Sequence, residues 1–410
     1  MPYIQRAITP ILKQRVSTSK CMLLVGARQV GKSTLIKHEF KDFNRANFDD
    51  RLTRMQAKEE PKLFLLNNPQ PLFIDEVQKE SSILEDLKQI VDESDERGMF
   101  ILSGSQKLEL MKGMSESLAG RVSISELTGL SMREIYGVKF NRHFIPTDAY
   151  IKEREKEIVK YDNIWEIIHK GSYPELYDID RDWQEYYSSY VATYLERDIN
   201  ELVAADGITF TKFLTAVAAR TGELLNYSNI AGDVGVSEPT IKNWISILER
   251  TGIVYLLQPY SASALKRAIK TPKLYFRDTG LACYLTRWLT ADTLKCSAVA
   301  GNMFETFVVS EILKSYSNEG KDYRFNIFYY RGKDRNASGE NEIDLVIEED
   351  GVLYPVEIKM SGNPKASMGA TNQVLDKVSD KKRGLGVILC LIDKKTYLRE
   401  NLVALPIEFI

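Results

Sequence analysis

The strongest constraint in this 410-residue chain is the stretch CMLLVGARQVGKSTLIKHEF, which begins at Cys21. An apolar run leads into a glycine-bounded loop and then a helical pattern, the setting that the spacing G-x-x-x-x-G-K-[ST] requires. Gly26 and Gly31 allow the backbone to turn its N–H groups toward phosphate oxygens, and the following helix adds the positive end of its dipole. A glycine turn that matches by chance is the weaker interpretation. The sequence therefore predicts an α/β fold with a phosphate-binding loop.

The positions of this loop have expected roles in holding ATP together with Mg²⁺. Lys32 would reach the β- and γ-phosphates, Ser33 would offer its hydroxyl oxygen to Mg²⁺, and Thr34 would bond an inner phosphate. The residues expected to contact the nucleotide are Gly26, Ala27, Arg28, Gln29, Val30, Gly31, Lys32, Ser33 and Thr34. ATP or ADP is thus the expected small-molecule partner.

A second apolar run, PLFIDEVQ, ends in two acids that suit the same chemistry. Asp75 would hold Mg²⁺ directly or through water, and Glu76 would orient and polarise the attacking water. The alternative is a strand that ends in ordinary solvated acids. Because the acids accompany a phosphate-binding loop, we expect the catalytic role.

Two further positions are candidates with an equally plausible structural explanation. The strand MFILSGS ends in Ser103 and Ser105, either of which would sense a γ-phosphate, or the SGS triplet is simply a turn. Arg121, in SESLAGRV, would neutralise charge in the transition state of its own site or of a neighbouring copy's site. The alternative for Arg121 is a solvated or salt-bridged arginine.

These stretches resemble a known family. LLVGARQVGKSTL, LFIDEVQK, LSGSQKLEL and ESLAGRV are similar to the AAA-type P-loop ATPases of many bacteria and archaea, in which the ATPase precedes a C-terminal region of unknown function. The stretches KGSYPELY, YLERDI, KLYFRDTGLACYL and GNMFETFVVSEI extend the resemblance over nearly the whole chain. The resemblance implies ATP binding and hydrolysis, without implying a cellular task.

The middle of the chain has two helical patterns. In RDWQEYYSSYVATYLERDI, aromatic and aliphatic residues recur at helical spacing, which favours a core-facing stripe over a ligand site; these residues are Trp183, Tyr186, Tyr187, Tyr190, Tyr194 and Leu195. Further on, Ser228 and Ser237 are expected to cap two helices separated by a turn at Gly235, and Gly252 to end the second. A strand, IVYLLQPY, follows. This order predicts a winged helix-turn-helix.

Nucleic-acid binding by this module is an open question at the level of sequence. Residues 223–258 hold four acids but only Lys242 and Arg250 as basic residues, and a helix that meets phosphates is expected to be more basic. The next segment compensates in part with five basic residues, Lys266, Arg267, Lys270, Lys273 and Arg277. A protein-interaction or spacer module is the other interpretation, and it is somewhat favoured.

The stretch NEIDLVIEEDGVLYPVEIKM predicts two β-strands joined by a turn at Asp350-Gly351. Strand alternation places Asp344, Glu357 and Lys359 on one polar face. Such carboxylates suit Mg²⁺ or Mn²⁺, and a lysine beside them can hold an attacking water.

A further acid, Glu305, falls on the apolar stripe of a helix and needs a reason to be there. The order Glu305, Asp344, Glu357, Lys359 resembles the PD-(D/E)XK nucleases, although Glu342 and Ile343 replace the usual proline-aspartate pair. Gln373 lies where such folds often place another polar residue. A nuclease-like scaffold without activity is the alternative.

Composition limits the remaining possibilities. The net charge is −2, so nucleic acid would need a local basic patch, and the four cysteines are scattered. No apolar run approaches the roughly 20 residues that cross a bilayer, so we expect a cytoplasmic protein without membrane contact. The expected parts are an AAA+-like ATPase domain (1–140), a helical connection (141–222), a winged helix (223–290) and a restriction-endonuclease-like α/β domain (291–410).

Two functions from different classes are compatible with these parts. In the first, an Mg²⁺-dependent ATPase is coupled to a C-terminal module that binds or cuts DNA or RNA. In the second, the ATPase is regulatory, and the winged helix and an inactive nuclease-like domain are scaffolds for a protein partner. Homo-oligomers are expected if Arg121 serves a neighbouring copy's site.

Overall fold

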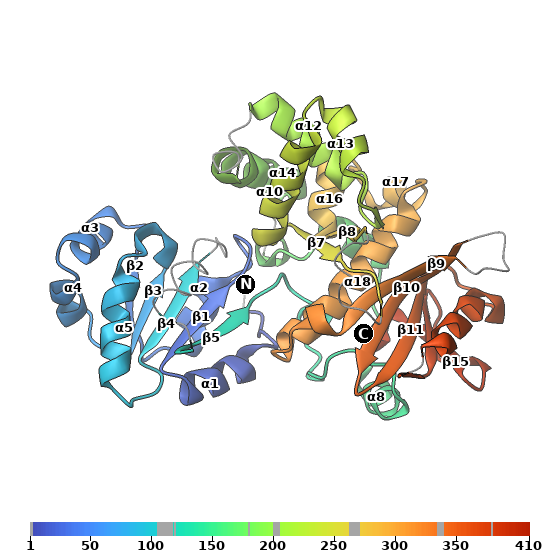
Figure 1. Ribbon diagram of the computed structural model, residues 1–410, viewed down its shortest axis with the longest axis horizontal. Coiled ribbons are helices and arrows are strands. Elements are labelled where there is room, and N and C mark those ends of the chain that lie inside the picture. The colour runs from blue at the N-terminus through green and yellow to red at the C-terminus, as the bar shows by residue number, and fades with distance from the viewer. Residues whose placement is uncertain are drawn as a thin grey trace.

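The computed structural model describes residues 3–104, 118, 120–178, 181–199, 206–261, 271–333, 340–378 and 380–410. Two large sheets lie at opposite ends of the molecule, and helices with a small antiparallel sheet lie between and above them (Figure 1). No helix within the described ranges combines the length and the apolar character that crossing a bilayer requires.

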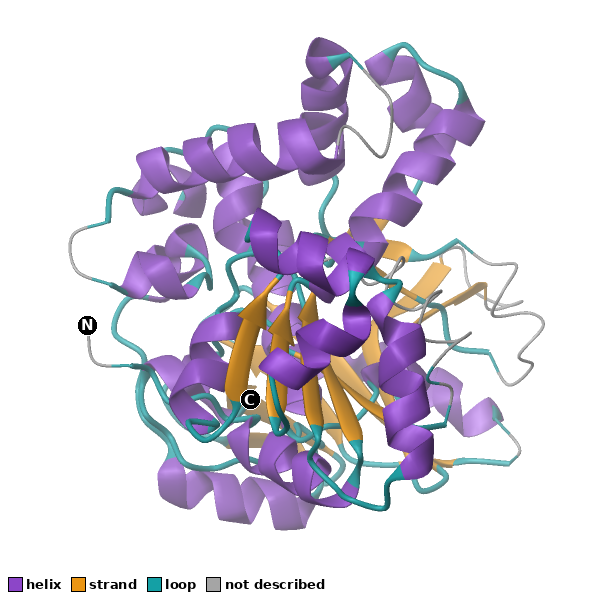
Figure 2. Ribbon diagram, turned by 90° about the vertical axis from the view of Figure 1, so that its left-hand side faces the viewer, coloured by secondary structure: helices purple, strands orange, loops and turns teal. Residues whose placement is uncertain are grey.

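The N-terminal sheet consists of short parallel strands in the order β2-β3-β4-β1-β5. The strands are β1 Cys21–Val25, β2 Asn44–Asn47, β3 Leu72–Asp75, β4 Phe100–Gly104 and β5 Val122–Glu126. Helices cover both faces (Figure 2), namely α1 Thr9–Thr18, α2 Lys32–Glu39, α3 Arg51–Glu59, α4 Pro61–Asn67 and α5 Ile83–Glu93. Because parallel strands share one carboxyl edge, the loop after β1 and the acids after β3 meet there. The predicted α/β fold is confirmed for this part.

Helices follow the first sheet, and the aromatic stripe is confirmed as core. The helices are α7 Met132–Ile135, α8 Asp148–Arg154, α9 Ile164–Lys170 and α10 Trp183–Tyr190, which continues as a π-helix over Val191–Ile199. The stripe from Tyr186 to Leu195 is buried, and Trp183 is half-buried. The Tyr173 hydroxyl donates to the Tyr190 hydroxyl at 2.9 Å, so the tyrosine cluster satisfies part of its own polarity.

A three-helix group and a small antiparallel sheet occupy the region predicted to be a winged helix. The helices are α12 Gly207–Ala218, α13 Tyr227–Val234 and α14 Glu238–Arg250, and the sheet has the order β6-β8-β7, with β6 Glu223–Leu224, β7 Val254–Leu257 and β8 Lys273–Phe276. The predicted cap at Ser228 is wrong: Asn226 caps α13, through the Asn229 N–H. Ser237 caps α14 as predicted, and Gly235 adopts a φ of 84° in the turn between them.

The C-terminal part combines a long helix with a mixed sheet of order β14-β15-β13-β11-β10-β9, with β12 beside β11. Its elements are α16 Thr279–Leu285, α17 Ala291–Lys295, α18 Ala300–Asn318, β9 Ile327–Lys333, β10 Glu340–Glu349, β11 Val352–Lys359, β12 Lys382–Arg383, β13 Gly386–Cys390, β14 Thr396–Arg399 and β15 Leu402–Pro406. Short 3₁₀ helices span Val77–Glu80, Glu155–Glu157, Pro174–Tyr177, Tyr323–Phe325, Ala366–Lys377 and Ile407–Phe409. The predicted hairpin is confirmed, since Asp350 and Gly351 have φ values of 49° and 77° in the turn.

Helix α18 lies between the two large sheets (Figure 1) and connects them with buried polar contacts. The Met132 N–H donates to the Glu311 carboxylate at 2.8 Å, and Lys314 Nζ donates to the Leu130 carbonyl at 3.0 Å. The most extensive of the apolar clusters formed by the described residues runs from β1 through the middle helices to β15. The residue ranges predicted for the four domains stay predictions.

Candidate functional site

The loop after β1 has the backbone that a phosphate-binding loop needs. A Cβ at Gly26 would lie 2.2 Å from the Leu127 carbonyl oxygen, so only glycine fits there. Gly31 has a φ of 93° and immediately precedes α2, and Gln29 also has a positive φ, of 62°. These positions turn the chain sharply before α2, whose first residues line the cleft described below.

Lys32 is folded back against its own loop. Its Nζ donates to the carbonyl oxygens of Gly26 and Ala27, both at 2.9 Å. Burial lowers the pKa of Lys32 to about 8, and the neighbouring Glu76 and Asp75 carboxylates partly oppose that shift. A buried ammonium whose acceptors are two weak carbonyl dipoles is well placed to exchange them for phosphate oxygens.

The acids after β3 lie at the same edge of the sheet. Asp75 is buried, and the Ser103 hydroxyl at the end of β4 donates to its carboxylate. Glu76 has a left-handed backbone with a φ of 53° and lines the cleft, and Gln78 donates to its carboxylate. Ser103 therefore positions Asp75 in this structure. Ser105 lies outside the described residues.

These residues surround a cleft of about 820 Å³, a volume in the range of small-molecule sites. Seven of the residues predicted from the sequence line this cleft, namely Arg28, Gln29, Gly31, Lys32, Ser33, Thr34 and Glu76. Gly26, Ala27, Val30, Asp75 and Ser103 lie outside the lining of the cleft and form its support. The residues of the phosphate-binding loop and the two acids therefore lie together at the carboxyl edge of the sheet.

Several residues of the cleft were not predicted from the sequence. Arg6 is buried and donates to the carbonyls of Val30 and Thr128, at 2.8 and 2.7 Å, while its Nε pairs with Glu134 at 2.9 Å. Further lining residues come from distant segments, namely Tyr3, Ile4, Asp49, Lys79, Leu130, Pro174, Glu175 and Asp178. No motif marks these positions, because each reaches the cleft only through the tertiary fold.

Arg121 is placed away from the cleft. It pairs with Asp92 of α5, is exposed, and is not among the residues that line the cleft. Action of Arg121 in its own site or in a neighbouring copy's site therefore stays a prediction. The salt-bridged alternative describes what the structure shows.

A second polar cluster forms on the hairpin as predicted. Lys359 Nζ lies 2.9 Å from Asp344 Oδ2 and 2.9 Å from Glu357 Oε2, and the Ile358 N–H also donates to Asp344 Oδ2 at 2.8 Å. Burial and the Asp344 charge raise the pKa of Glu357 to about 8, although Lys359 opposes the shift. Burial would lower the pKa of Lys359, but Asp344 and Glu357 raise it overall.

Lys273, on β8, completes this cluster and was expected to be part of a basic surface. Its Nζ lies 3.2 Å from Glu305 Oε1 and 2.6 Å from Glu342 Oε1. Glu305 also accepts from the Tyr275 hydroxyl at 2.6 Å. Burial would lower the pKa of Lys273, yet the carboxylates of Glu305, Asp344 and Glu342 raise it overall. Burial and Asp344 raise the pKa of Glu305 against the opposing effect of Lys273.

The expected metal ligands are therefore engaged by lysines. Within the described part of the chain, no group of three or more His, Cys, Asp or Glu side chains is arranged to hold a metal ion. Gln373 is exposed, while its neighbour Asn372 is buried. Metal binding by Glu305, Asp344 and Glu357 stays a prediction.

The predicted basic patch after β7 is not formed by the residues that are described. Lys273 is buried, and Arg277 is half-buried and pairs with Glu126 of β5 at 2.9 Å. Both cations pair with partly buried acids, which compensate their charge. Lys266, Arg267 and Lys270 lie outside the described residues.

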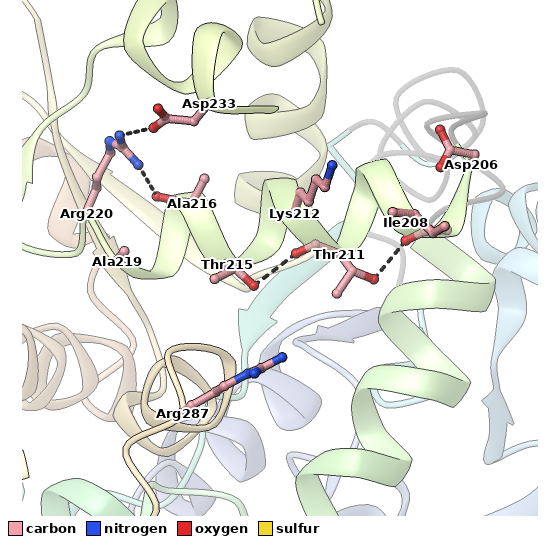
Figure 3. A pocket seen from close by; sticks show the side chains of 11 residues that line it. Asp206, Ile208, Thr211, Lys212, Thr215, Ala216, Ala219, Arg220, Asp233 and Arg287 are labelled. Atoms are coloured by element: carbon pink, nitrogen blue, oxygen red, sulfur yellow. Dashed lines mark hydrogen bonds and ion pairs between the residues drawn. The ribbon is translucent and has the colours of Figure 1, made fainter. Parts of the chain in front are cut away.

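A larger hollow, of about 1000 Å³, lies along α12, and several of its polar groups bond within the local structure (Figure 3). Arg220 pairs with Asp233 and donates to the Ala216 carbonyl at 2.8 Å. The Thr211 and Thr215 hydroxyls donate to carbonyls one turn earlier. The P-loop cleft is therefore the stronger candidate site.

Three family models match the chain in succession. Residues 18–136 match the family described as AAA domain. The N-terminal part is an AAA-type P-loop domain. Residues 161–292 and 300–410 match two domains of unknown function, DUF8612 and DUF4143.

Relatives with curated sequences extend over most of the chain. Uncharacterized proteins of Mycobacterium bovis and Mycobacterium tuberculosis are each 27% identical over 375 residues, which is 89% of this chain and 76% of theirs. Among solved structures, the Walker-type ATPase of Pyrococcus abyssi is 14% identical, covers 68% of this chain and 94% of its own, and has a TM-score of 0.43. RuvB of Thermotoga maritima is 16% identical over 60% of this chain and 85% of its own, with a TM-score of 0.24. These structural likenesses are too distant to bear on function.

Proposed function

We propose that this protein is an Mg²⁺-dependent ATPase that converts ATP to ADP and phosphate. The observation that carries the proposal is Lys32, whose buried ammonium is held by two loop carbonyls beside a cleft that also contains Glu76. The match of residues 18–136 to the AAA domain family supports it.

The proposed roles follow from position. Lys32, Ser33 and Thr34 line the cleft at the start of α2, where N–H groups and the helix dipole favour an anion. Ser33 and Asp75 offer the hard oxygen donors that suit Mg²⁺, which would supply charge neutralisation between phosphates. Glu76 lines the cleft and is proposed to orient and deprotonate the attacking water.

Phosphate release from ATP by the full-length protein tests this proposal. Wild type should turn over ATP with Mg²⁺ and stop with EDTA, and Lys32→Ala should lose nucleotide binding. Lys37→Ala is the matched control, because Lys37 lies on the same helix and is exposed. Equal turnover by wild type and Lys32→Ala would refute the proposal.

For the rest of the chain, the observations favour a regulatory ATPase with scaffold modules. We propose that the described residues between 223 and 290 form a winged helix and that the C-terminal sheet is a PD-(D/E)XK-like scaffold. Lysines engage Glu305, Asp344 and Glu357, and the described basic residues of the wing segment face inward.

The nuclease alternative makes an opposite prediction in a single assay. ATP turnover and strand cleavage are measured in the same tubes, with Mn²⁺ and with single- or double-stranded DNA or RNA. The scaffold proposal expects no cleavage and no effect of Glu357→Ala combined with Lys359→Ala on any nucleic-acid response. Cleavage that disappears in the double variant would establish the nuclease instead.

A further inference from the structure

One short segment contacts both polar sites of the molecule. It comprises the strand β8, Lys273–Phe276, and the two residues that follow it, Arg277 and Asp278. We name residues 273–278 the connector. Its first side chain enters the C-terminal acidic cluster, and its last side chain holds a loop of the nucleotide cleft.

The nucleotide end of the connector is Asp278. Its Oδ2 accepts from the Ser172 N–H at 2.6 Å and from the Ser172 hydroxyl at 2.8 Å, and its Oδ1 accepts from the Tyr187 hydroxyl at 2.6 Å. Ser172 lies just before Pro174 and Glu175, which line the cleft. Because a buried carboxylate with several donors fixes its partners firmly, Asp278 sets the position of that wall.

A second route runs through the phosphate-binding loop itself. A Cβ built at Gly252 would lie 3.6 Å from the Ala27 Cβ, so the turn before β7 packs directly on the loop. The Arg277 N–H donates to the Ile253 carbonyl at 3.0 Å, and the Arg277 guanidinium pairs with Glu126. Lys32 donates to the Ala27 carbonyl, so a phosphate that attracts Lys32 also changes the forces on Ala27.

The opposite end of the connector is Lys273. Its ammonium pairs with Glu305 and Glu342, while Lys359 pairs with Asp344 and Glu357. Glu357 Oε1 is buried without a hydrogen-bond partner, so the cluster is not fully satisfied by these lysines. Buried acids of this kind repel one another when a compensating cation withdraws. We call the cluster closed when the Lys273 ammonium pairs with Glu305 and Glu342. The position of Lys273 thus decides whether the cluster is closed.

We propose that the connector transmits the state of the nucleotide cleft to the acidic cluster, with Lys273 as an internal cation that closes the cluster. The inference depends on the proposed nucleotide binding. All four residues of β8 pair with β7, and two of them also pair with β6, so we expect the strand to move as a unit. A nucleotide that displaces Ala27 or residues 172–175 should therefore displace β8 and change the distances between Lys273 and its carboxylate partners. This requires that the nucleotide bind one position of the connector more tightly than the other.

Hydrogen–deuterium exchange of the full-length protein tests this inference, with and without ADP and Mg²⁺. In wild type, nucleotide should slow exchange in peptides of residues 26–34 and change it at least twofold in residues 273–278 and 341–347. A response at 26–34 without any response at 341–347 would overturn the inference and leave the proposed function intact. No response at 26–34 would overturn both.

Two variants cut the connector at different ends. Asp278→Asn should keep the response at 26–34 and weaken it at 341–347, because only the route through Ala27 and Gly252 remains. Ser172→Ala is a milder variant because the Ser172 N–H still reaches Asp278. Lys273→Met should make exchange at 341–347 independent of nucleotide. Lys381→Met is the matched control, since Lys381 pairs with Glu348 elsewhere on β10 at 2.8 Å. A full nucleotide response at 341–347 in Lys273→Met would overturn the inference.

Discussion

At the scale of single residues, Glu76 has a left-handed backbone conformation and lines the cleft. A non-glycine residue at a positive φ costs on the order of 1 kcal/mol, and such positions concentrate where a side chain must be aimed. The Gln78 side chain holds the carboxylate from the next turn. These features support the role of a base that acts on water.

Glu76→Gln is expected to bind ATP nearly as well as wild type but to hydrolyse it about 100-fold more slowly or worse, because an amide cannot take the proton. Fluorescent-nucleotide titration and single-turnover phosphate release measure the two quantities separately. Glu80→Gln is the control, since Glu80 lies on the neighbouring 3₁₀ turn and its carboxylate accepts from the exposed Ser82 hydroxyl at 2.6 Å. Unchanged single-turnover hydrolysis in Glu76→Gln would remove Glu76 as the base.

The sequence predicts residues whose roles are local, and it misses those whose roles depend on distant contacts. Lys32 and Glu76 follow from spacing within one loop or one strand end. Arg6 and Lys273 have no local signal, because their partners Glu134 and Glu305 are supplied by other elements of the fold. The ion-pair partner of Arg121 could not be foreseen for the same reason, since Asp92 belongs to α5.

At the scale of elements, the turn between α13 and α14 gives a clean pair of substitutions. Gly235 has a φ of 84° and Gly232 lies within α13, and a Cβ at either position would meet nothing within 4 Å. Gly235→Ala should cost about 1 kcal/mol of unfolding free energy through backbone strain alone. Gly232→Ala should add about 0.5–1 kcal/mol, because alanine favours a helix interior. Urea unfolding measures both changes in the free energy of unfolding. Two stabilising or two destabilising changes would contradict the assigned turn.

The hairpin makes a second prediction, on pH. The folded-state pKa of Glu357 is raised from 4.5 to about 8, chiefly by burial, so the folded state binds more protons than the unfolded state between these values. Stability from this group is present at low pH and is lost as pH rises through that window, by at most about 1.4 kcal/mol per pH unit. The Glu357→Gln variant should therefore gain stability relative to wild type between pH 5.5 and 8.5.

Urea unfolding at four pH values measures this difference. Glu348→Gln, on the same hairpin and paired with Lys381, is the control for loss of a carboxylate. A difference between wild type and Glu357→Gln that does not change with pH would show that Glu357 titrates normally.

Element types were more predictable than their edges. The hairpin and α14 follow from alternation, turn residues and capping. The start of α13 was missed because Asn226 precedes Ser228 and caps the helix first, right after the short strand β6. Helix α12 was not foreseen as a neighbour of α13, since the two helices pack by contacts that no local pattern encodes.

At the scale of the whole molecule, the chain end is bound by the segment that directly follows the first sheet. The last three carbonyls each accept from one side chain of residues 133–154: Ile410 from Arg133 at 3.0 Å, Phe409 from Tyr150 at 2.8 Å and Glu408 from Arg154 at 2.8 Å. Because these donors are buried, residues 133–154 and residues 408–410 stabilise one another. These hydrogen bonds could not be predicted, since no sequence pattern relates residues 133–154 to carbonyl groups more than 250 residues later.

Tyr150→Phe tests whether the molecule unfolds as one unit. The substitution removes the donor to Phe409 and the acceptor of Arg133 Nη2, which lies 2.7 Å from the Tyr150 hydroxyl, and it should cost about 1–3 kcal/mol because both groups are buried. Exchange measured in urea should show equal losses of stability for peptides of β1 and of β13, because one core spans them. Tyr397→Phe is the control, since Tyr397 is exposed. Loss confined to β13 would mean that the C-terminal sheet unfolds independently of the nucleotide cleft, and any coupling between them would then have to act through the connector alone.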